Sequence, residues 1–244
     1  MKRTFFFAHI LILFLFFTMF PSVELPEAFG KTHFVVGVDS QEIIKKSKIK
    51  SKASIEDILK PTEHGIRHVM FAPDDNVLSM LKKLIGKEKT SIRMAAFLLT
   101  DYEIVKAIVQ AKARGVIVEI IFDPKGIKDR YSKIARMLRG KGVDIFVYKS
   151  FSNNSQSHLS NIMHNKFIVF GENIFGKSLV WTGSFNFTYS AHRVNQENVV
   201  ILDDSDLIKK FIDRFDHIRN KLCYVFRNNN RKRSKRSSRK KKRA

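Results

Sequence analysis

Apolar and polar positions alternate along the middle of the chain in a way that predicts short strands separated by helices. Runs rich in Val, Ile and Phe, typical of buried strands, occur at 69–71, 91–99, 116–122, 143–148, 163–170, 178–182 and 198–202. Between them, apolar residues at helical spacing predict helices over 77–85, 101–114, 128–139 and 204–219. Strands that alternate with helices favour βαβ units. We therefore expect an α/β domain whose mixed, mostly parallel sheet is flanked by helices on both faces.

Local signals support several of these boundaries. Asp101 precedes a helical pattern and is a favourable N-cap residue, and Gly115 follows the same pattern as a C-terminal stop. Ser54 has the same N-cap character before a short helical segment. A polar stretch rich in Ser and Asn at 149–161 interrupts the regular pattern just before the strand at 163–170. We expect this stretch to form a loop over a functional site.

The N-terminal residues have the pattern of a targeting segment. Lys2 and Arg3 precede a largely apolar run at 5–20, and small residues follow at 28 and 30. This arrangement predicts a signal peptide over 1–30, with cleavage after Gly30 and export of the protein. The apolar run is shorter than the roughly 20 residues of a typical membrane span. An uncleaved N-terminal membrane anchor is the alternative.

The net positive charge is concentrated in the C-terminal tail, but the body of the chain is also basic. The formal net charge is +22, and 227–244 hold eleven Lys and Arg residues without an acidic residue. Because 1–30 balance to zero, 31–226 carry +11. We expect an extension or linker at 31–66, a catalytic domain at 67–226 and a basic disordered tail at 227–244. A basic body favours polyanionic partners such as nucleic acid or anionic lipid, although a composition rich in Lys, Asn and Ile also raises the charge.

Cysteine usage limits the chemistry. The chain has one cysteine, Cys223. It therefore has no intrachain disulfide and no zinc site built from several cysteines.

Polar residues gather at the ends of three consecutive predicted strands. His164 and Lys166 are two residues apart and project to the same side of a strand, Ser184 and Asn186 follow Gly183, and Glu197 precedes the last strand. Each residue has a structural explanation on its own, since G-S-F-N suits a turn and a single His is usually structural. Taken together, an imidazole, an ammonium, a hydroxyl, an amide and a carboxylate form a set suited to holding and attacking a phosphate. A buried Lys also needs an anionic partner.

These residues resemble the signature of the phospholipase D superfamily, H-x-K followed by G-S-x-N. The two parts are His164-Asn165-Lys166 and Gly183-Ser184-Phe185-Asn186, and the resemblance extends over about 67–218. The chain resembles the short, single-motif bacterial nuclease and phospholipase D-like branch. It is also similar to mitochondrial cardiolipin hydrolase, which carries a Cys-rich zinc element that one cysteine cannot supply.

The resemblance implies a metal-free hydrolysis of phosphodiesters without a cofactor. His164 would be the nucleophile that forms a phosphohistidine, and a second histidine would act as acid and then as base. Lys166, Ser184 and Asn186 would bind the nonbridging oxygens, and Glu197 would orient the imidazole. Because the chain contains one motif, the resemblance also implies a homodimer in which two copies of His164 share one site.

One position departs from the family pattern. The family usually has Asp seven residues after the histidine, where this chain has Gly171 followed by Glu172. The family Asp is generally structural, so the difference concerns the stability of this edge, and Glu172 is a candidate replacement.

The substrate stays open at this point. The single-motif form and the basic tail favour nucleic acid and an endonuclease, whereas export and the apolar N-terminus favour a phospholipase D acting on lipids such as cardiolipin or phosphatidylcholine. A non-catalytic binder of nucleic acid or membrane is a third hypothesis.

Overall fold

A computed structural model describes residues 53–128, 131–150 and 161–227. The predicted signal or anchor at 1–30, the stretch 31–52, the segment 151–160 of the polar loop and the tail from residue 228 lie outside the described residues.

The elements follow the predicted alternation. The helices are α3 Ile55–Ile58, α4 Val77–Lys87, α5 Tyr102–Ala113, α6 Ser132–Gly140, α7 Tyr189–Arg193 and α8 Ser205–Leu222, with short 3-10 helices η1 Pro124–Ile127 and η3 Ile174–Gly176. The strands are β1 Arg67–Ala72, β2 Ser91–Ala96, β3 Ile117–Phe122, β4 Asp144–Tyr148, β5 Lys166–Phe170, β6 Leu179–Gly183, β7 Glu197–Leu202 and β8 Cys223–Val225.

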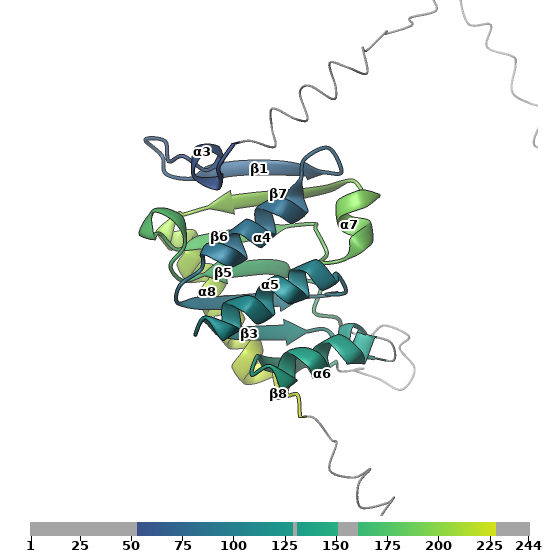
Figure 1. The fold of residues 1–244 in the computed structure, drawn as a ribbon. Helices are drawn as coiled ribbons and strands as arrows, with labels where there is room; N and C mark the ends of the chain where they lie inside the picture. The colour runs from purple at the N-terminus through teal and green to yellow at the C-terminus, as the bar shows by residue number, and fades with distance from the viewer. Residues whose placement is uncertain (1–52, 129–130, 151–160, 228–244) are drawn as a thin grey trace, which may run out of the picture. The chain divides into compact units, whose positions relative to one another are not determined.

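The strands form one mixed sheet with helices on both faces. Their order is β1-β7-β6-β5-β2-β3-β4-β8. Helices α4, α5 and α6 lie across one face, and α8 crosses the other, as Figure 1 shows. The predicted α/β architecture with a flanked mixed sheet is confirmed.

The proportion of parallel strands is lower than expected. Only β2 with β3 and β3 with β4 pair in parallel, whereas the other five pairings are antiparallel within the described residues. The two parallel pairs are joined by crossovers through α5 and α6, because parallel pairing needs a long connection. Strands β5 and β6 are joined by the turn at 171–178, whereas the connection between β6 and β7 at 184–196 includes α7. The other antiparallel pairs, β1–β7, β2–β5 and β4–β8, join strands far apart in the sequence, so their direction follows from the path of the whole chain.

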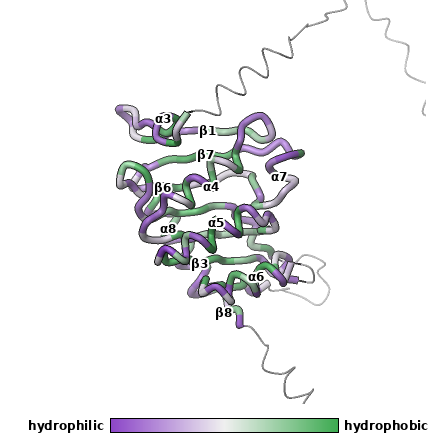
Figure 2. Tube along the Cα trace, viewed as in Figure 1, coloured by the Kyte–Doolittle hydropathy of each residue, from purple (hydrophilic) through white to green (hydrophobic). Residues whose placement is uncertain are grey.

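Two hydrophobic layers, one on each face of the sheet, form the core. The layer under α4, α5 and α6 includes Leu84, Ile108 and Trp181, and the layer under α8 includes Phe167 and Phe215. The strands in the middle of the sheet are predominantly hydrophobic along their length (Figure 2), because both of their faces are covered. On the α8 side, the ring of Phe167 packs edge-on against that of Phe215, with centroids 6.5 Å apart.

The folded unit begins before the predicted boundary at residue 67. Ser54 caps α3 in a reciprocal capping box with Asp57, as its N-cap character indicated. Ile55, Leu59 and Ile66 are each at most 3% exposed and join the core. The segment from residue 53 therefore belongs to the domain. A second difference concerns α6, which begins at Ser132 rather than at 128, because residues 124–127 form a separate 3-10 turn capped by Asp123.

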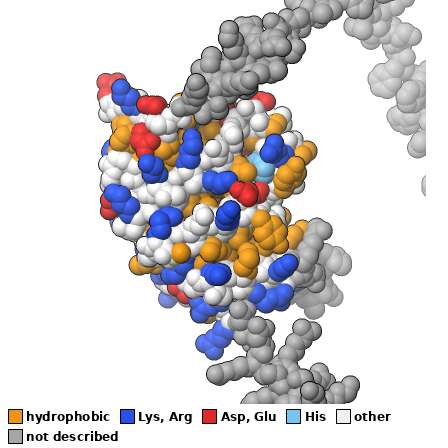
Figure 3. Space-filling view, in the orientation of Figure 1, with side chains coloured by type: hydrophobic (Ala, Val, Ile, Leu, Met, Phe, Trp, Pro, Cys, Tyr) orange, Lys and Arg blue, Asp and Glu red, His pale blue; other side chains and the backbone are white. Residues whose placement is uncertain are grey.

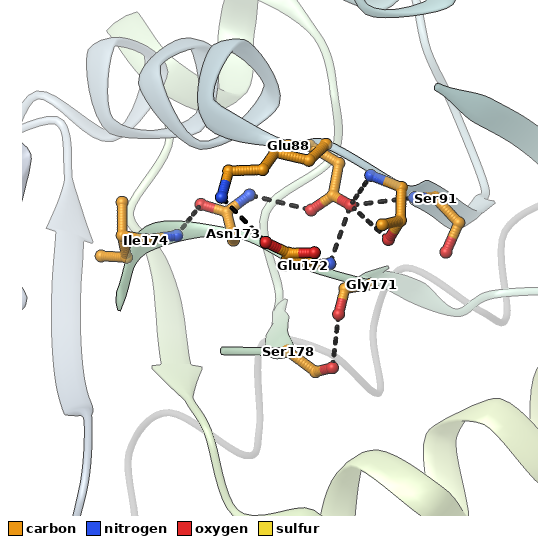
Figure 4. A network of polar contacts seen from close by, with 9 residues as sticks. Glu88, Ser91, Gly171, Glu172, Asn173, Ile174 and Ser178 are labelled. Carbon is orange, nitrogen blue, oxygen red and sulfur yellow. Dashed lines mark hydrogen bonds and ion pairs between the residues drawn. The ribbon is translucent and has the colours of Figure 1, made fainter. Parts of the chain in front are cut away.

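A buried carboxylate stabilises the edge at which Gly171 replaces the family aspartate (Figure 4). Glu88, which is 2% exposed, accepts hydrogen bonds from the backbone N–H groups of Thr90, Ser91 and Glu172 and from the side chain of Asn173. A Cβ atom at position 171 would meet the hydroxyl oxygens of Thr90 and Ser91.

The proposed replacement by Glu172 is therefore wrong. Its carboxylate pairs with Lys89 at 2.8 Å on the surface, where both side chains are at least 40% exposed. The carboxylate that stabilises this edge belongs instead to Glu88, the C-cap residue of α4. It can do so because the missing side chain at Gly171 leaves room for the start of β2 to pack closely.

Lys and Arg outnumber Asp and Glu on the face shown in Figure 3, as the basic composition predicts. In the described part of the chain, no helix combines the length and the apolar character that crossing a membrane requires.

Candidate active site

The strand register brings the predicted site residues to one edge of the sheet. Strand β5 runs antiparallel to both of its neighbours, so its first residue, Lys166, pairs with the last residue of β2, Ala96. The end of β6 at Gly183 and the start of β7 at Glu197 lie at the same edge, because β6 and β7 are also antiparallel. This is the edge at which α7 lies (Figure 1).

His164 and Lys166 differ in their surroundings. His164 precedes β5 and is exposed, and its ring packs edge-on against Phe97 with centroids 4.6 Å apart. Lys166 is only 8% exposed, and its Nζ donates a hydrogen bond of 2.9 Å to the carbonyl oxygen of His164. The Lys166 ammonium also lies 5.2 Å from the centroid of the Phe97 ring. The hydrogen bond thus holds the buried Lys166 ammonium next to the backbone of His164.

The electrostatics of this pair favour a neutral imidazole. Although His164 is exposed, the hydration that its ring loses against neighbouring groups lowers its pKa below the ordinary value; the nearby Lys166 ammonium lowers this pKa further, and the Asp123 carboxylate opposes the shift. Burial also lowers the pKa of Lys166, against an opposing effect of the Glu197 carboxylate. A neutral ring nitrogen carries the lone pair that a nucleophile requires.

Ser184 and Glu197 form a second cluster across β6 and β7. The Ser184 hydroxyl donates to the Glu197 carboxylate at 2.5 Å and accepts from the backbone N–H of Asn198 at 3.0 Å. Gly183 makes this approach possible, because a Cβ atom there would meet the carbonyl oxygen of Asn198. The second Glu197 oxygen accepts from the Asn195 side chain at 2.9 Å.

Within one chain, Glu197 therefore holds the serine loop and not the imidazole. Its hydrogen bonds go to Ser184 and Asn195, and its charge reaches Lys166 through space. The predicted orientation of His164 by Glu197 stays a prediction. Asn186 also has unused bonding capacity, since its side-chain oxygen is buried and has no hydrogen-bond partner in the described part of the chain.

Two residues at the site were not identified from the sequence. The Asp123 carboxylate is 1% exposed and accepts from the backbone N–H of Met163 at 2.8 Å and of Lys125 at 2.9 Å. Phe97 donates its backbone N–H to the carbonyl oxygen of Asn165 and presents its ring to His164. Asp123 resembled an ordinary turn residue and Phe97 an ordinary strand residue, so only their positions next to the H-x-K segment reveal this role.

A buried histidine supports the loop that carries Ser184 and Asn186. His192 of α7 contacts the Asp101 carboxylate at 2.9 Å, and both side chains are 6% exposed. The backbone N–H groups of Thr100 and Asp101 donate to the carbonyl oxygen of Phe187, just after Asn186. The N-cap of α5, predicted from the sequence, thus also anchors the second half of the site. Among the described residues, no group of three or more His, Cys, Asp or Glu side chains is arranged to hold a metal ion.

Comparisons with known proteins point to one family. The family model described as "Cardiolipin synthase, PLD-like domain" matches residues 81–219. Phospholipase D of Rickettsia conorii is 34% identical over 145 residues, which are 59% of this chain and 65% of that protein. Mitochondrial cardiolipin hydrolase of Xenopus tropicalis is 29% identical over 144 residues, 59% of this chain and 61% of the relative. The chain thus spans less than two thirds of these two relatives.

A solved structure agrees over a larger share of its length. The phospholipase D family member Nuc from Salmonella typhimurium is 32% identical, with a TM-score of 0.54, and the match covers 66% of this chain and 98% of Nuc. Together with the H-x-K and G-S-x-N residues at one sheet edge, these matches show that the chain belongs to the phospholipase D-like family.

Proposed function

We propose that the protein hydrolyses phosphodiesters through a phosphohistidine intermediate, with His164 as nucleophile. One observation supports this proposal most directly. The exposed His164 has a lowered pKa, and the buried Lys166 ammonium is hydrogen-bonded to its backbone carbonyl oxygen. The ammonium can bind a nonbridging oxygen of a phosphate that approaches His164. The Asn186 amide lies at the same edge for the other nonbridging oxygen, and the Ser184 hydroxyl would join it by turning its proton from Glu197 to the phosphate.

The reaction has two displacements at phosphorus. In the first, a ring nitrogen of His164 forms the P–N bond while the bond to the leaving oxygen breaks, and a second histidine gives that oxygen a proton. In the second, the same histidine takes a proton from water, whose oxygen attacks phosphorus as the P–N bond breaks. Glu197 keeps the Ser184 hydroxyl in place through its 2.5 Å hydrogen bond.

The second histidine is proposed to come from another copy of the chain. The chain supplies one H-x-K segment, and His192, which packs near the site, is buried against Asp101. A C2 dimer would bring two copies of His164 together at its axis and form one shared site.

Nucleic acid is the substrate that we favour. The basic composition supports it, since 31–226 carry +11 and a cationic surface favours a polyanion. A phospholipid substrate is the second candidate, because the similar Rickettsia conorii and Xenopus tropicalis proteins are named phospholipase D and cardiolipin hydrolase.

Hydrolysis of bis(4-nitrophenyl) phosphate with and without EDTA tests the reaction. The wild type should release 4-nitrophenol in both conditions, and His164→Asn should release none while still binding substrate. No release by the wild type would refute the enzyme proposal and favour a non-catalytic binder, and full loss with EDTA would refute the metal-free mechanism. Parallel incubation with single-stranded DNA, RNA, cardiolipin and phosphatidylcholine decides the substrate.

Subunit exchange tests the shared site. If each active site needs two copies of His164, random exchange of an equal mixture of wild type and His164→Asn leaves active only the dimers with two wild-type chains. Activity of the mixture should then fall to about half of its value before exchange. An unchanged activity after exchange, confirmed by mass spectrometry of mixed dimers, would show that each chain works alone.

A further inference from the structure

Lys125 places a second ammonium group beside His164. It lies in η1, directly after β3, and its Nζ is 5.8 Å from the centroid of the Phe97 ring. The same ring contacts His164 and lies 5.2 Å from Nζ of Lys166. Two cations and the proposed nucleophile thus all lie around one aromatic side chain.

The position of Lys125 is determined by buried structure. The two oxygens of the Asp123 carboxylate accept the backbone N–H groups of Lys125 and Met163, which joins η1 to the segment just before His164. Because Asp123 is 1% exposed, these two hydrogen bonds are shielded from water and hold the two segments in register. The backbone that carries Lys125 is therefore attached to the backbone that carries His164.

The charges around the Phe97 ring favour an anionic ligand. In the described residues Lys125 forms no ion pair with a carboxylate, and its charge adds to that of Lys166 in opposing protonation of His164, against the opposite effect of the buried Asp123 carboxylate. The oxygens of Asp123 accept backbone N–H groups, so the exposed Lys125 ammonium is left to bind an anion from outside the chain. The two ammonium nitrogens are at most about 11 Å apart, since both lie within 6 Å of the Phe97 centroid. This upper bound leaves the two ammonium groups close enough to contact one nucleic-acid strand at the same time.

We propose that Lys125 binds a phosphate next to the scissile one on a nucleic-acid strand, while Lys166 holds the scissile phosphate itself. This inference rests on the proposed function and narrows it to substrates with consecutive phosphates. The exposed side chain of Lys125 can follow a flexible strand, whereas the buried Lys166 cannot move far. Phe97 serves both cations as a common apolar support.

Binding in an inactive background tests the inference without turnover. His164→Asn, alone and combined with Lys125→Gln or Lys83→Gln, is titrated with labelled oligothymidylate over a range of KCl concentrations. Lys83 is an exposed lysine on α4 and serves as the matched charge control. Lys125→Gln should weaken binding about two- to fivefold, as expected for an exposed ion pair. It should also reduce the salt slope by about 0.7, which corresponds to one phosphate contact. Equal behaviour of the two Gln variants would overturn the proposal.

Kinetics in the active protein separate the scissile from the flanking phosphate. Lys125→Gln should raise KM for oligothymidylate by a larger factor than KM for bis(4-nitrophenyl) phosphate, which has one phosphate. Equal factors would place Lys125 at the scissile phosphate and refute the flanking role. Dependence on Lys125 with cardiolipin vesicles but not with oligothymidylate would also refute it. If the wild type hydrolyses neither substrate, the proposed reaction is refuted. The role of Lys125 in binding is still tested, because the titration needs no hydrolysis.

Discussion

Replacement of Glu88 by Ala should destabilise the protein strongly, although this residue lies at the edge of the sheet opposite His164. The carboxylate accepts five hydrogen bonds: three from backbone N–H groups, one from the Thr90 hydroxyl and one from the Asn173 amide. In Glu88→Ala these donors, of which the Asn173 amide is buried and the others are partly buried, lose their acceptor. Each unsatisfied donor costs about 1–3 kcal/mol, and neighbouring losses are not additive.

We expect a loss of about 3–5 kcal/mol in the free energy of unfolding, because several hydrogen-bond donors lose one charged acceptor at the same time. For a domain of this size the melting temperature should fall by about 6–20 °C. Glu88→Gln keeps one acceptor oxygen and should cost less. Thermal unfolding followed by circular dichroism measures both variants.

Glu172→Ala is the matched control. It removes a carboxylate at the same edge, but one whose ion pair with Lys89 is solvent-exposed, so its melting temperature should stay close to that of the wild type. A fall of less than 2 °C for Glu88→Ala would refute the argument, and a larger fall for Glu172→Ala than for Glu88→Ala would restore Glu172 as the replacement for the family aspartate.

Three further predictions concern the site. The imidazole of His164 should titrate by NMR with a pKa below 6.5, so that its neutral form persists as the pH falls below that value, and Lys125→Gln should raise this pKa. A pKa above 6.5 in the wild type would contradict the described electrostatics. Glu197→Gln should lower kcat for bis(4-nitrophenyl) phosphate about 10²-fold with an unchanged circular dichroism spectrum, because the hydroxyl of Ser184 loses its anionic partner. A fall in kcat of less than about threefold would exclude this role. His192→Ala should lower the free energy of urea unfolding by about 1.5–3 kcal/mol, because the buried Asp101 carboxylate loses a hydrogen bond, and it should retain hydrolysis of the same substrate. If the folded variant does not hydrolyse this substrate, His192 is the proton donor.

Local chemistry in the sequence determined most of the elements and their caps. The N-cap roles of Ser54 and Asp101 follow from hydrogen bonds between a side chain and the backbone two or three residues away. The signature residues were equally visible, because H-x-K and G-S-x-N are short patterns with fixed spacing. Their gathering at one edge could be expected once the alternation of strands was recognised, since strand ends meet at sheet edges.

The direction of strand pairing was not determined by local signals. A run such as 198–202 has the same apolar pattern in a parallel and in an antiparallel sheet, and its antiparallel pairing with β1 and β6 depends on how the rest of the chain is arranged. The bounds of α6 depended similarly on the turn that Asp123 caps, since this carboxylate also binds the Met163 N–H, forty residues away.

The α/β class, the caps and the presence of one His164–Lys166 segment with Ser184 and Asn186 follow from local sequence patterns. The fold was needed to show which carboxylates join distant segments: Glu88 rather than Glu172 at the edge opposite the site, and Asp123 beside the site. Each of these carboxylates accepts N–H groups from residues two or three positions away, which a sequence can indicate, and also an N–H group from a distant segment. That second contact exists only after folding has brought the two segments together.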